Sequence, residues 1–342
     1  MSKIIEEFHK ASALMNDNQL DEAAELFLSL AKTELEPFCY YQLAQIANMM
    51  NDPEVAYNLY YKAFAAKPDL AANLYNKDHS SFTYVFPGLK EEKEINHCPL
   101  CGQQGVPRWT YPLPEAIGYN SFFNPIRLWM YCTDCNHMFA RHFPEKLFLH
   151  NNSPRKANPA FFSYYSNILH KVRQYAPGMT LFEVGIGAGE CLLSAREIGY
   201  ECFGIDVIAR HVEDIHNKYG LNVAVADFVE YAPDKKWDVV VMGDVLEHVS
   251  NPIQAITKAA DMLTENGALW VSTPNFESAY SYTAGHNDAM RRQQYHINYF
   301  SRDSFYALLN KAGLIPVDYQ ISQHYYGSME VIAIKASRIQ KS

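Results

Sequence analysis

Two pairs of cysteines in the middle of the chain have the spacing of a metal site. Cys98 and Cys101 enclose Pro-Leu, Cys132 and Cys135 enclose Thr-Asp, and 30 residues separate the pairs. Each CxxC turn can present two thiolates to one side, so the two turns together can complete a tetrahedral zinc site. Because four protein ligands leave no open position for water, we expect this zinc to be structural. A redox-active dithiol is the alternative interpretation.

Two histidines are possible substitute ligands for this site, whereas the three remaining cysteines are not expected to take part in it. His137 and His142 stand close enough in the sequence to replace one of the four ligands. Cys39, Cys191 and Cys202 lie within apolar patterns, so we expect them to be buried thiols.

A glycine-rich turn follows an apolar strand at residues 181–190. Gly185, Gly187 and Gly189 alternate with small or apolar residues, and a helix is expected to begin at about Glu190. Glycine lets the backbone approach a ligand closely, and a helix N-terminus favours polar or anionic groups. The segment therefore predicts a nucleotide-type cofactor.

The spacing of these glycines disfavours NAD. A dinucleotide fingerprint, G-x-G-x-x-G, would need its third glycine at position 190, where this chain has glutamate. Glu183 also precedes the first glycine by two residues. Its carboxylate would repel a pyrophosphate but would suit a cofactor that carries a sulfonium and an ammonium group.

This segment resembles the first motif of class I S-adenosylmethionine (SAM)-dependent methyltransferases, and further motifs follow in that family's order over residues 160–336. The resemblance implies that Asp206 binds both ribose hydroxyls, that Asp227 bonds the adenine amine and that Phe228 lies beside the ring. The segments 237–249 and 267–275 resemble the fourth and fifth strands. The implied cofactor-binding residues are Glu183, Gly185, Gly187, Gly189, Asp206, Val207, Asp227, Phe228 and Asp244.

His248, His296 and Tyr295 are the candidate catalytic residues. His248 follows the fourth strand, and His296 stands just before an expected helix over 302–312. Methyl transfer needs a base only when the acceptor carries a proton of high pKa. For each histidine, a packing or capping role is the alternative.

A narrower resemblance points to sugar C-methyltransferases that act on nucleotide-linked 4-keto sugars and place a zinc ribbon before the methyltransferase domain. Their histidine-bearing segments line up with 245–248 and 295–301, and in that group the histidines and a tyrosine would remove the proton next to the keto carbon. Here Tyr295 stands where an acid is expected, and the large C-terminal domain has no counterpart. The Leu-Glu-His segment also occurs in O-methyltransferases resembling those of ubiquinone synthesis, so carbon, oxygen and nitrogen all stay open as the methylated atom.

The elements that must position these residues alternate between short β-rich runs and helical patterns. The expected strands cover 181–185, 201–206, 222–226, 237–242 and 267–272, with an antiparallel final strand at 328–335. This alternation predicts an α/β, Rossmann-like domain whose ligand crevice lies beyond the carboxyl ends of the strands.

Residues 1–70 show only helical periodicity, with breaks near 16–18, 36–37, 51–53 and 67–68. The segment 37–70 resembles a 34-residue tetratricopeptide (TPR) repeat, and an ordinary helical bundle is the alternative. Two repeats are fewer than an independent solenoid needs, which favours a TPR-like module that self-associates or docks to a partner protein.

The sequence thus predicts three parts: a TPR-like module over 1–75, a connector and zinc ribbon over 76–157, and a methyltransferase domain over 158–342. With 48% hydrophobic residues, global disorder is excluded. No apolar run is long enough for a membrane span, and the N-terminus lacks a signal-peptide pattern, so we expect a cytoplasmic protein with reduced cysteines.

The leading hypothesis is a SAM-dependent methyltransferase with a small-molecule acceptor, a nucleotide-activated sugar or glycan precursor. Arg291 and Arg292 could clamp its diphosphate. An RNA methyltransferase with a zinc module is one alternative, although the net charge of −9 speaks against nucleic acid. A non-catalytic TPR scaffold with a vestigial SAM fold is the other.

Overall fold

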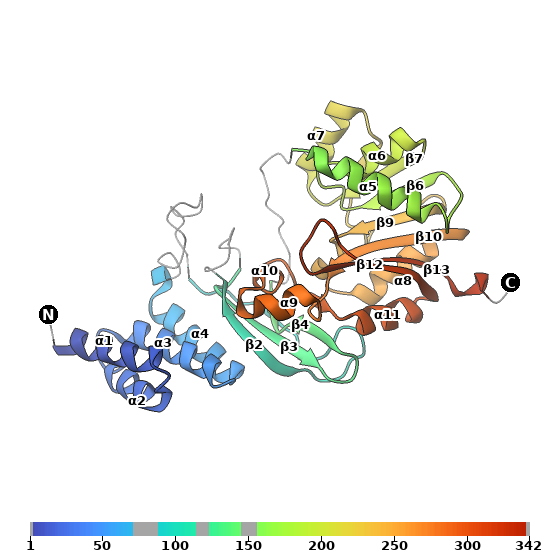
Figure 1. Cartoon of the computed structure of the whole chain (residues 1–342). Coiled ribbons are helices and arrows are strands. Elements are labelled where there is room, and N and C mark those ends of the chain that lie inside the picture. Colours follow the sequence, from blue (N-terminus) through green and yellow to red (C-terminus); the bar gives the residue numbers. More distant parts are fainter. Residues whose placement is uncertain (1–2, 71–87, 114–122, 145–155, 340–342) are drawn as a thin grey trace.

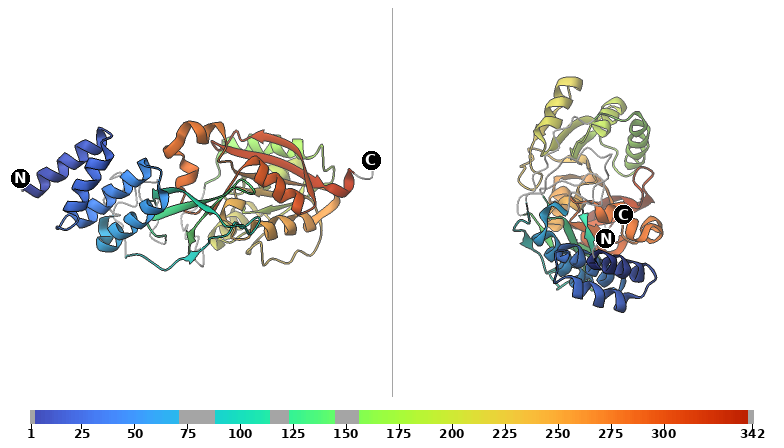
Figure 2. Two further views of the ribbon diagram at one scale, coloured as in Figure 1. Left: turned by 90° about the horizontal axis from the view of Figure 1, so that it is seen from below. Right: turned by 90° about the vertical axis from the view of Figure 1, so that its left-hand side faces the viewer.

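The computed structural model describes residues 3–70, 88–113, 123–144 and 156–339. A helical module, a small antiparallel sheet and a larger α/β sheet follow one another along the long axis of the molecule (Figure 1). The two termini lie at opposite ends of this axis (Figure 2).

The N-terminal module consists of four helices whose ends fall at the predicted breaks. They are α1 (Lys3–Asn16), α2 (Leu20–Leu30), α3 (Glu36–Met49) and α4 (Pro53–Ala66). Helix α4 begins at Pro53 because the Asp52 side chain accepts a hydrogen bond from Val55 N and Pro53 has no N–H to leave unpaired. The small residues Ala44 and Ala56 are fully buried, which lets α3 and α4 pack closely. The all-helical prediction is confirmed, and the TPR assignment stays a prediction.

The helical module rests directly on the small sheet. Thr110 Oγ1 donates a hydrogen bond to Pro53 O at 2.5 Å, and Asn48 Nδ2 donates to Thr110 O at 3.1 Å. Ile126 adds an apolar contact to the cluster formed by α3 and α4. These contacts join the first two parts of the chain.

The small sheet, hereafter the ribbon sheet, takes one strand from the C-terminal part of the chain. Its order is β11-β4-β3-β2, all antiparallel, and a separate pair is formed by β1 and β5. The strands are β1 (Lys93–Glu94), β2 (Val106–Pro112), β3 (Ile126–Cys132), β4 (His137–Ala140), β5 (His142–Phe143) and β11 (Asn298–Phe300). An isolated parallel bridge between Asn275 and Phe300 attaches the other edge of β11 to the end of β10. Strand β11 therefore crosses the predicted boundary at 157/158.

The larger sheet has seven strands in the order β12-β13-β10-β9-β6-β7-β8, and β13 is antiparallel to both of its neighbours. The strands are β6 (Thr180–Val184), β7 (Glu201–Asp206), β8 (Val223–Val225), β9 (Trp237–Gly243), β10 (Leu263–Pro274), β12 (Leu314–Ile321) and β13 (Ser328–Lys335). The chain order reverses between β6 and β9, where ligands bind in open α/β sheets. The Rossmann-like prediction, including the final antiparallel strand, is confirmed.

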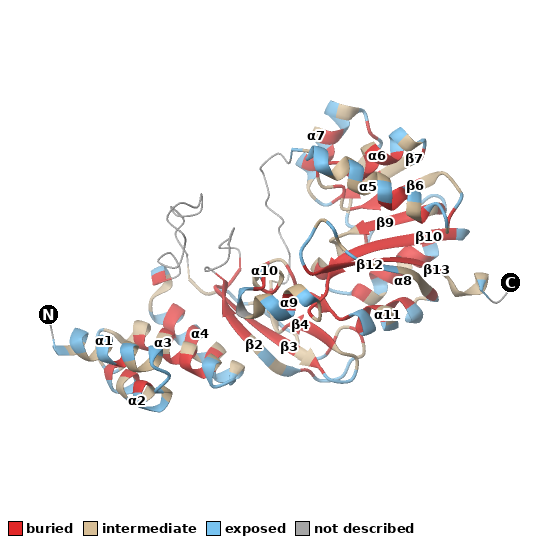
Figure 3. Ribbon diagram, in the orientation of Figure 1, coloured by how far each residue is buried: buried red, intermediate tan, exposed pale blue. Residues whose placement is uncertain are grey.

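Helices cover both faces of this sheet, and its inner strands β6, β9 and β13 are largely buried, whereas the edge strands β8 and β12 are mostly half-buried or exposed (Figure 3). The main helices are α5 (Pro159–Val172), α6 (Glu190–Ile198), α7 (Ala209–Tyr219), α8 (Pro252–Met262) and α11 (Arg302–Lys311). Helices α5, α6 and α7 share one apolar core, and α8 and α11 share the other with the cysteine end of the ribbon sheet. The shorter elements are η4 (Leu246–His248), α9 (Ala279–Ala284), η5 (Gly285–Asn287), α10 (Ala289–Arg292) and η6 (Ala336–Arg338). None of the helices in the described part of the chain has the length and apolar character that crossing a membrane requires.

Gly204 in β7 packs closely against Ile186 of the glycine-rich turn and Leu192 of α6. A Cβ atom there would lie 2.5 Å from Ile186 Cγ2 and 2.8 Å from Leu192 Cδ1. We expect Gly204→Ala to lower the free energy of unfolding by about 1–3 kcal/mol through overpacking, measured by urea denaturation. Gly243→Ala is the matched control, because its Cβ would meet Trp270 at an ordinary 3.4 Å. Equal effects of the two substitutions would contradict the tight packing under the turn.

Candidate active site and metal centre

The glycine-rich turn between β6 and α6 requires its glycines. Gly185, Gly187 and Gly189 have φ angles of 75°, 54° and 84°, all in the left-handed region that side chains disfavour. A Cβ on Gly185 would also lie 2.9 Å from Val245 Cγ2. Gly189 is the N-cap of α6, so the turn delivers its backbone amides to the carboxyl ends of the strands.

Asp206 ends β7 beside this turn, as the sequence predicted. Its Oδ2 accepts a hydrogen bond from Gly187 N at 3.3 Å, and its Oδ1 accepts one from Ile208 N at 2.8 Å. His211, which the sequence analysis missed, is buried with Nδ1 3.7 Å from the same Oδ2. No sequence pattern could have found this contact, because it depends on how α7 lies against β7.

The residues implied to hold the adenosine lie beyond β7 and β8. Val207 follows Asp206 and is exposed. Asp227 follows β8, and its side chain accepts a hydrogen bond from Val229 N at 2.8 Å. Phe228 is buried in the core, with Lys258 Nζ 5.5 Å from its ring centroid.

Acidic side chains gather around the turn. Glu183 is buried, its Oε2 has no hydrogen-bond partner within the described structure, and burial together with the nearby charges of Glu190 and Asp206 raises its pKa well above the usual range. Asp244 directly follows β9. It has a φ angle of 51° and accepts a hydrogen bond from Ser272 Oγ at 3.0 Å. A cationic ligand would relieve this repulsion, and the orphaned carboxylate oxygen offers it a partner.

The structure brings His248 and His296 together although 47 residues lie between them in the sequence. Their ring centroids are 5.0 Å apart. His248 Nδ1 lies 3.0 Å from Tyr295 O, and His296 Nδ1 lies 2.9 Å from Met290 O. A carbonyl only accepts hydrogen bonds, so each Nδ1 carries a proton, and in the neutral form of either ring Nε2 is the basic nitrogen. Burial and the nearby His248 lower the pKa of His296 well below its usual value.

Glu247 completes this cluster and was not predicted. It is 1% exposed, with Oε1 3.9 Å from His248 Nε2, and its Oε2 accepts a hydrogen bond from Thr273 Oγ1 at 3.1 Å. Burial and the charge of Asp244 raise its pKa well above the usual range. One ligand atom from each of Glu247, His248 and His296 falls within a 4.8 Å group, so these side chains could also hold a divalent cation.

Strand β11 holds the turn that carries His248. Ile297 N donates to Glu247 O at 2.8 Å, and Asn298 Nδ2 donates to Val249 O at 2.7 Å. Asn298 Oδ1 lies 3.2 Å from Nε2 of His137, which is fully buried in the ribbon sheet. His137 is thus engaged by Asn298, and His142 stacks on Tyr57.

Two further predicted residues, Tyr295 and Arg291, lie outside the cluster of Glu247, His248 and His296. Tyr295 is half-buried, and its ring packs edge-on against Phe123 with centroids 4.8 Å apart. Arg291 is 7% exposed and forms an ion pair with the fully buried Asp288, Nε to Oδ2 3.2 Å. Its guanidinium carbon also lies 3.7 Å from the ring centroid of Trp109, so Arg291 is not available as half of a diphosphate clamp.

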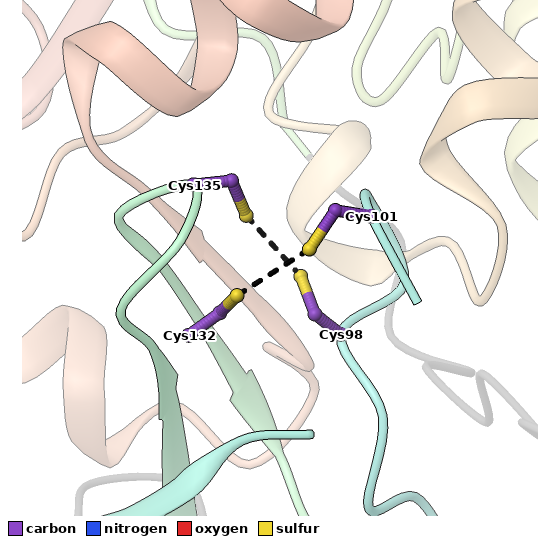
Figure 4. A group of neighbouring side chains, drawn as sticks. All are labelled: Cys98, Cys101, Cys132 and Cys135. Carbon is purple, nitrogen blue, oxygen red and sulfur yellow. Dashed lines mark hydrogen bonds between the residues drawn. The ribbon is translucent and has the colours of Figure 1, made fainter. Parts of the chain in front are cut away.

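The four predicted cysteines converge on one point (Figure 4). Sγ atoms of Cys98 and Cys135, and of Cys101 and Cys132, are 3.4 Å apart, and all four fall within a group 4.8 Å across. These distances are too long for a disulfide and suit a zinc ion about 2.3 Å from each sulfur. The hydrogen bond with Cys135 lowers the pKa of Cys98 to about 6 and raises that of Cys135, so the cluster readily yields a thiolate.

Comparison with known proteins agrees with this geometry. A family described as a methyltransferase domain matches residues 137–318, more than half of the chain, and the chain belongs to that family. The matched region is a class I SAM-dependent methyltransferase domain, and the helical module and most of the ribbon sheet precede it in the chain.

Curated relatives match part of the chain. The ubiquinone biosynthesis O-methyltransferase of Glaesserella parasuis is 31% identical over 109 residues, which cover 29% of this chain and 46% of the relative. The enzyme of the same name from Cereibacter sphaeroides is 29% identical over 153 residues, covering 41% of this chain and 62% of the relative. The chain therefore spans about half the length of these relatives.

Solved structures with a similar arrangement include magnesium protoporphyrin IX methyltransferase from Synechocystis with bound SAH. It has 14% identity and a TM-score of 0.42, covering 54% of this chain and 90% of its own. DesVI from Streptomyces venezuelae has 15% identity and a TM-score of 0.43, covering 52% of this chain and 92% of its own.

Replacing Asp206 tests the cofactor site. Asp206→Ala removes a carboxylate that can accept hydrogen bonds from both ribose hydroxyls, so we expect a loss of about 2–3 kcal/mol in binding, or about 30- to 150-fold weaker SAM binding. Isothermal titration calorimetry measures this, with Glu213→Ala, an exposed acid on α7, as the control. Unchanged affinity in Asp206→Ala would place the ribose elsewhere.

Replacing cysteines tests the metal centre. The unmodified chain should contain about one zinc ion, and Cys98→Ser with Cys132→Ser should lose it and melt at a lower temperature. Mass-spectrometric metal analysis and thermal denaturation provide the readouts. Cys202→Ser, outside the cluster, should keep its zinc. Absence of zinc from the unmodified chain would exclude the site.

Proposed function

We propose that this chain transfers the methyl group of SAM to a small-molecule acceptor, with the histidine pair as general base. The observation that carries the proposal is the convergence of two imidazoles, each with Nδ1–H on a carbonyl, next to the carboxyl end of β9. Ligands of open α/β sheets bind beyond the carboxyl ends of the strands, so this position supports a role for the pair beside the acceptor.

The chain's own residues fit SAM. The amides of the glycine turn would contact its methionine part, Asp206 would bind the ribose hydroxyls, and Asp227 would bond the adenine amine. Glu183 and Asp244 lie beside the turn, and a sulfonium and an ammonium group would favour the charged forms of their carboxyl groups. When bound, SAM supplies an activated methyl group, and the protein must align the acceptor with it.

The histidines would remove the acceptor proton. The proton of the acceptor atom would pass to Nε2 of His248 or His296, while Nδ1–H stays on its carbonyl and keeps the ring oriented. The raised pKa of Glu247 leaves a buried carboxyl group beside the pair that can exchange the proton further. Tyr295 remains a candidate for orienting the acceptor.

The relatives' names favour oxygen as the methylated atom. Within small molecules, we propose a nucleotide-activated sugar or related glycan precursor, on the resemblance to sugar methyltransferases that also carry a zinc ribbon. The buried ion pair of Arg291 means that a diphosphate would have to be bound by other residues.

The accessory parts have structural roles in this proposal. Zinc bound by the four thiolates would hold the end of the ribbon sheet against α8 and α11, whose core contains Cys98 and Cys132. The helical module would mediate self-association or docking to a partner enzyme. Seven free cysteines fit a reducing compartment, which supports a cytoplasmic location.

The proposal is tested by a labelled-methyl assay against a panel of nucleotide sugars and phenolic acceptors, with mass spectrometry to locate the methyl group. His248→Gln and His296→Gln should each lower kcat by about 100-fold or more while SAM affinity stays unchanged. Because burial lowers the pKa of His296, its neutral, basic form persists below pH 6.5. The acid limb of kcat should therefore lie below that pH.

His9→Gln is the control, since this exposed histidine lies on α1. Loss of activity on adding EDTA to fully zinc-loaded enzyme, with zinc retained, would assign Glu247, His248 and His296 to a cation instead. Methylation of RNA but not of small molecules would overturn the acceptor class. Failure to bind SAM in calorimetry would favour the scaffold alternative.

A further inference from the structure

We propose that Arg127, a residue of the ribbon sheet, is a positioning residue for the histidine pair. It would act by fixing the backbone on both sides of Tyr295, without touching cofactor or acceptor. The inference deepens the proposed function and rests on it, because it assumes that the histidines are the base.

Arg127 makes its hydrogen bonds to the main chain of the catalytic segment. It lies on β3 and is 2% exposed. Its Nη2 donates to Gln294 O at 2.6 Å, and its Nη1 donates to His296 O. These carbonyls belong to the residues immediately before and after Tyr295. One planar guanidinium therefore binds the main chain on both sides of that residue.

The carbonyl between these two is the one that orients His248. Tyr295 O accepts the hydrogen bond from His248 Nδ1 at 3.0 Å. When the carbonyls at 294 and 296 are fixed, the carbonyl at 295 has little freedom to rotate away. The bond to Tyr295 O keeps the proton on Nδ1, so Arg127 controls which nitrogen of His248 is basic.

Arg127 also lies directly against His296, because its Nη1 donates to the main-chain oxygen of that residue. The charge of Arg127 persists at neutral pH, because burial lowers its pKa only to about 10 while Glu92 favours the charged form. The donor to both carbonyls is therefore a cation, which strengthens the two hydrogen bonds that fix the segment.

A purely structural role would not need an arginine here. The side chain lies in an aromatic setting, with its guanidinium carbon 5.7 Å from the Trp129 ring centroid and 5.9 Å from that of Phe143. A buried charge is costly unless its hydrogen bonds are made, and an apolar side chain of similar size would fill the same space. What only arginine supplies is a charged, two-pronged donor to two carbonyls that are separated by one intervening residue.

The test reads the imidazoles themselves and needs no acceptor. The full chain, loaded with zinc and labelled with ¹⁵N-histidine, is followed by NMR between pH 8 and 5, with His248→Gln and His296→Gln used only to assign the signals. In the unmodified chain we expect neutral His248 as a single Nδ1–H tautomer. In Arg127→Gln we expect neutral His248 to populate both tautomers, because Tyr295 O is no longer held in place.

Arg127→Lys keeps the charge but cannot bridge both carbonyls. His248 should therefore populate both tautomers in this variant too. Arg141→Gln is the matched control, since Arg141 lies in the same part of the chain but pairs with Glu54 and Glu94, and it should leave the His248 tautomer unchanged.

Unchanged histidine signals in a folded Arg127→Gln chain, checked by circular dichroism, would overturn the inference. If Arg127→Gln does not fold, an unchanged His248 tautomer in Arg127→Lys would overturn it. Failure of the proposed function would look different: the signals would respond as expected while no acceptor in the panel became methylated.

Discussion

The pairing of β11 with β4 is the interaction on which the rest of the site depends. Three residues of β11 join the ribbon sheet on one edge, and Phe300 bridges to Asn275 at the end of β10 on the other. The ribbon sheet and the α/β sheet are therefore hydrogen-bonded through one short strand. Because Ile297 and Asn298 also hold the turn at His248, any displacement of the ribbon sheet would displace a catalytic candidate.

Burial of ionisable groups sets the chemistry of both candidate sites. At the glycine turn, burial and the charges of Glu190 and Asp206 raise the pKa of Glu183, and a cationic cofactor would favour its charged form. At the histidine pair, burial lowers the pKa of His296 and keeps that ring neutral. Desolvation thus favours a cationic ligand at one site and a neutral base at the other, because the two groups differ in charge type.

Local patterns predicted the elements well, because each strand and helix carries its own periodicity. The strands at 201–206 and 328–335 have the predicted bounds, and the breaks between the N-terminal helices fall where Asn, Asp and Pro cluster. The ribbon strand at 298–300 could not be predicted as such. Its three residues are too short to show alternation, and its partners come from more than 150 residues upstream.

The sequence by itself determined the glycine turn, the acid at the end of the second strand and the two CxxC pairs, since each is a short motif whose function needs particular residue types at fixed spacing. It predicted His248 and His296 as candidates but not their contact, and it did not predict the roles of Glu247, Asn298 and Arg127. Only the tertiary structure determines these contacts. It also buries Arg291 in an ion pair with Asp288. The physical reason is that burial and hydrogen-bond partners belong to contacts between distant segments, which no local spacing encodes.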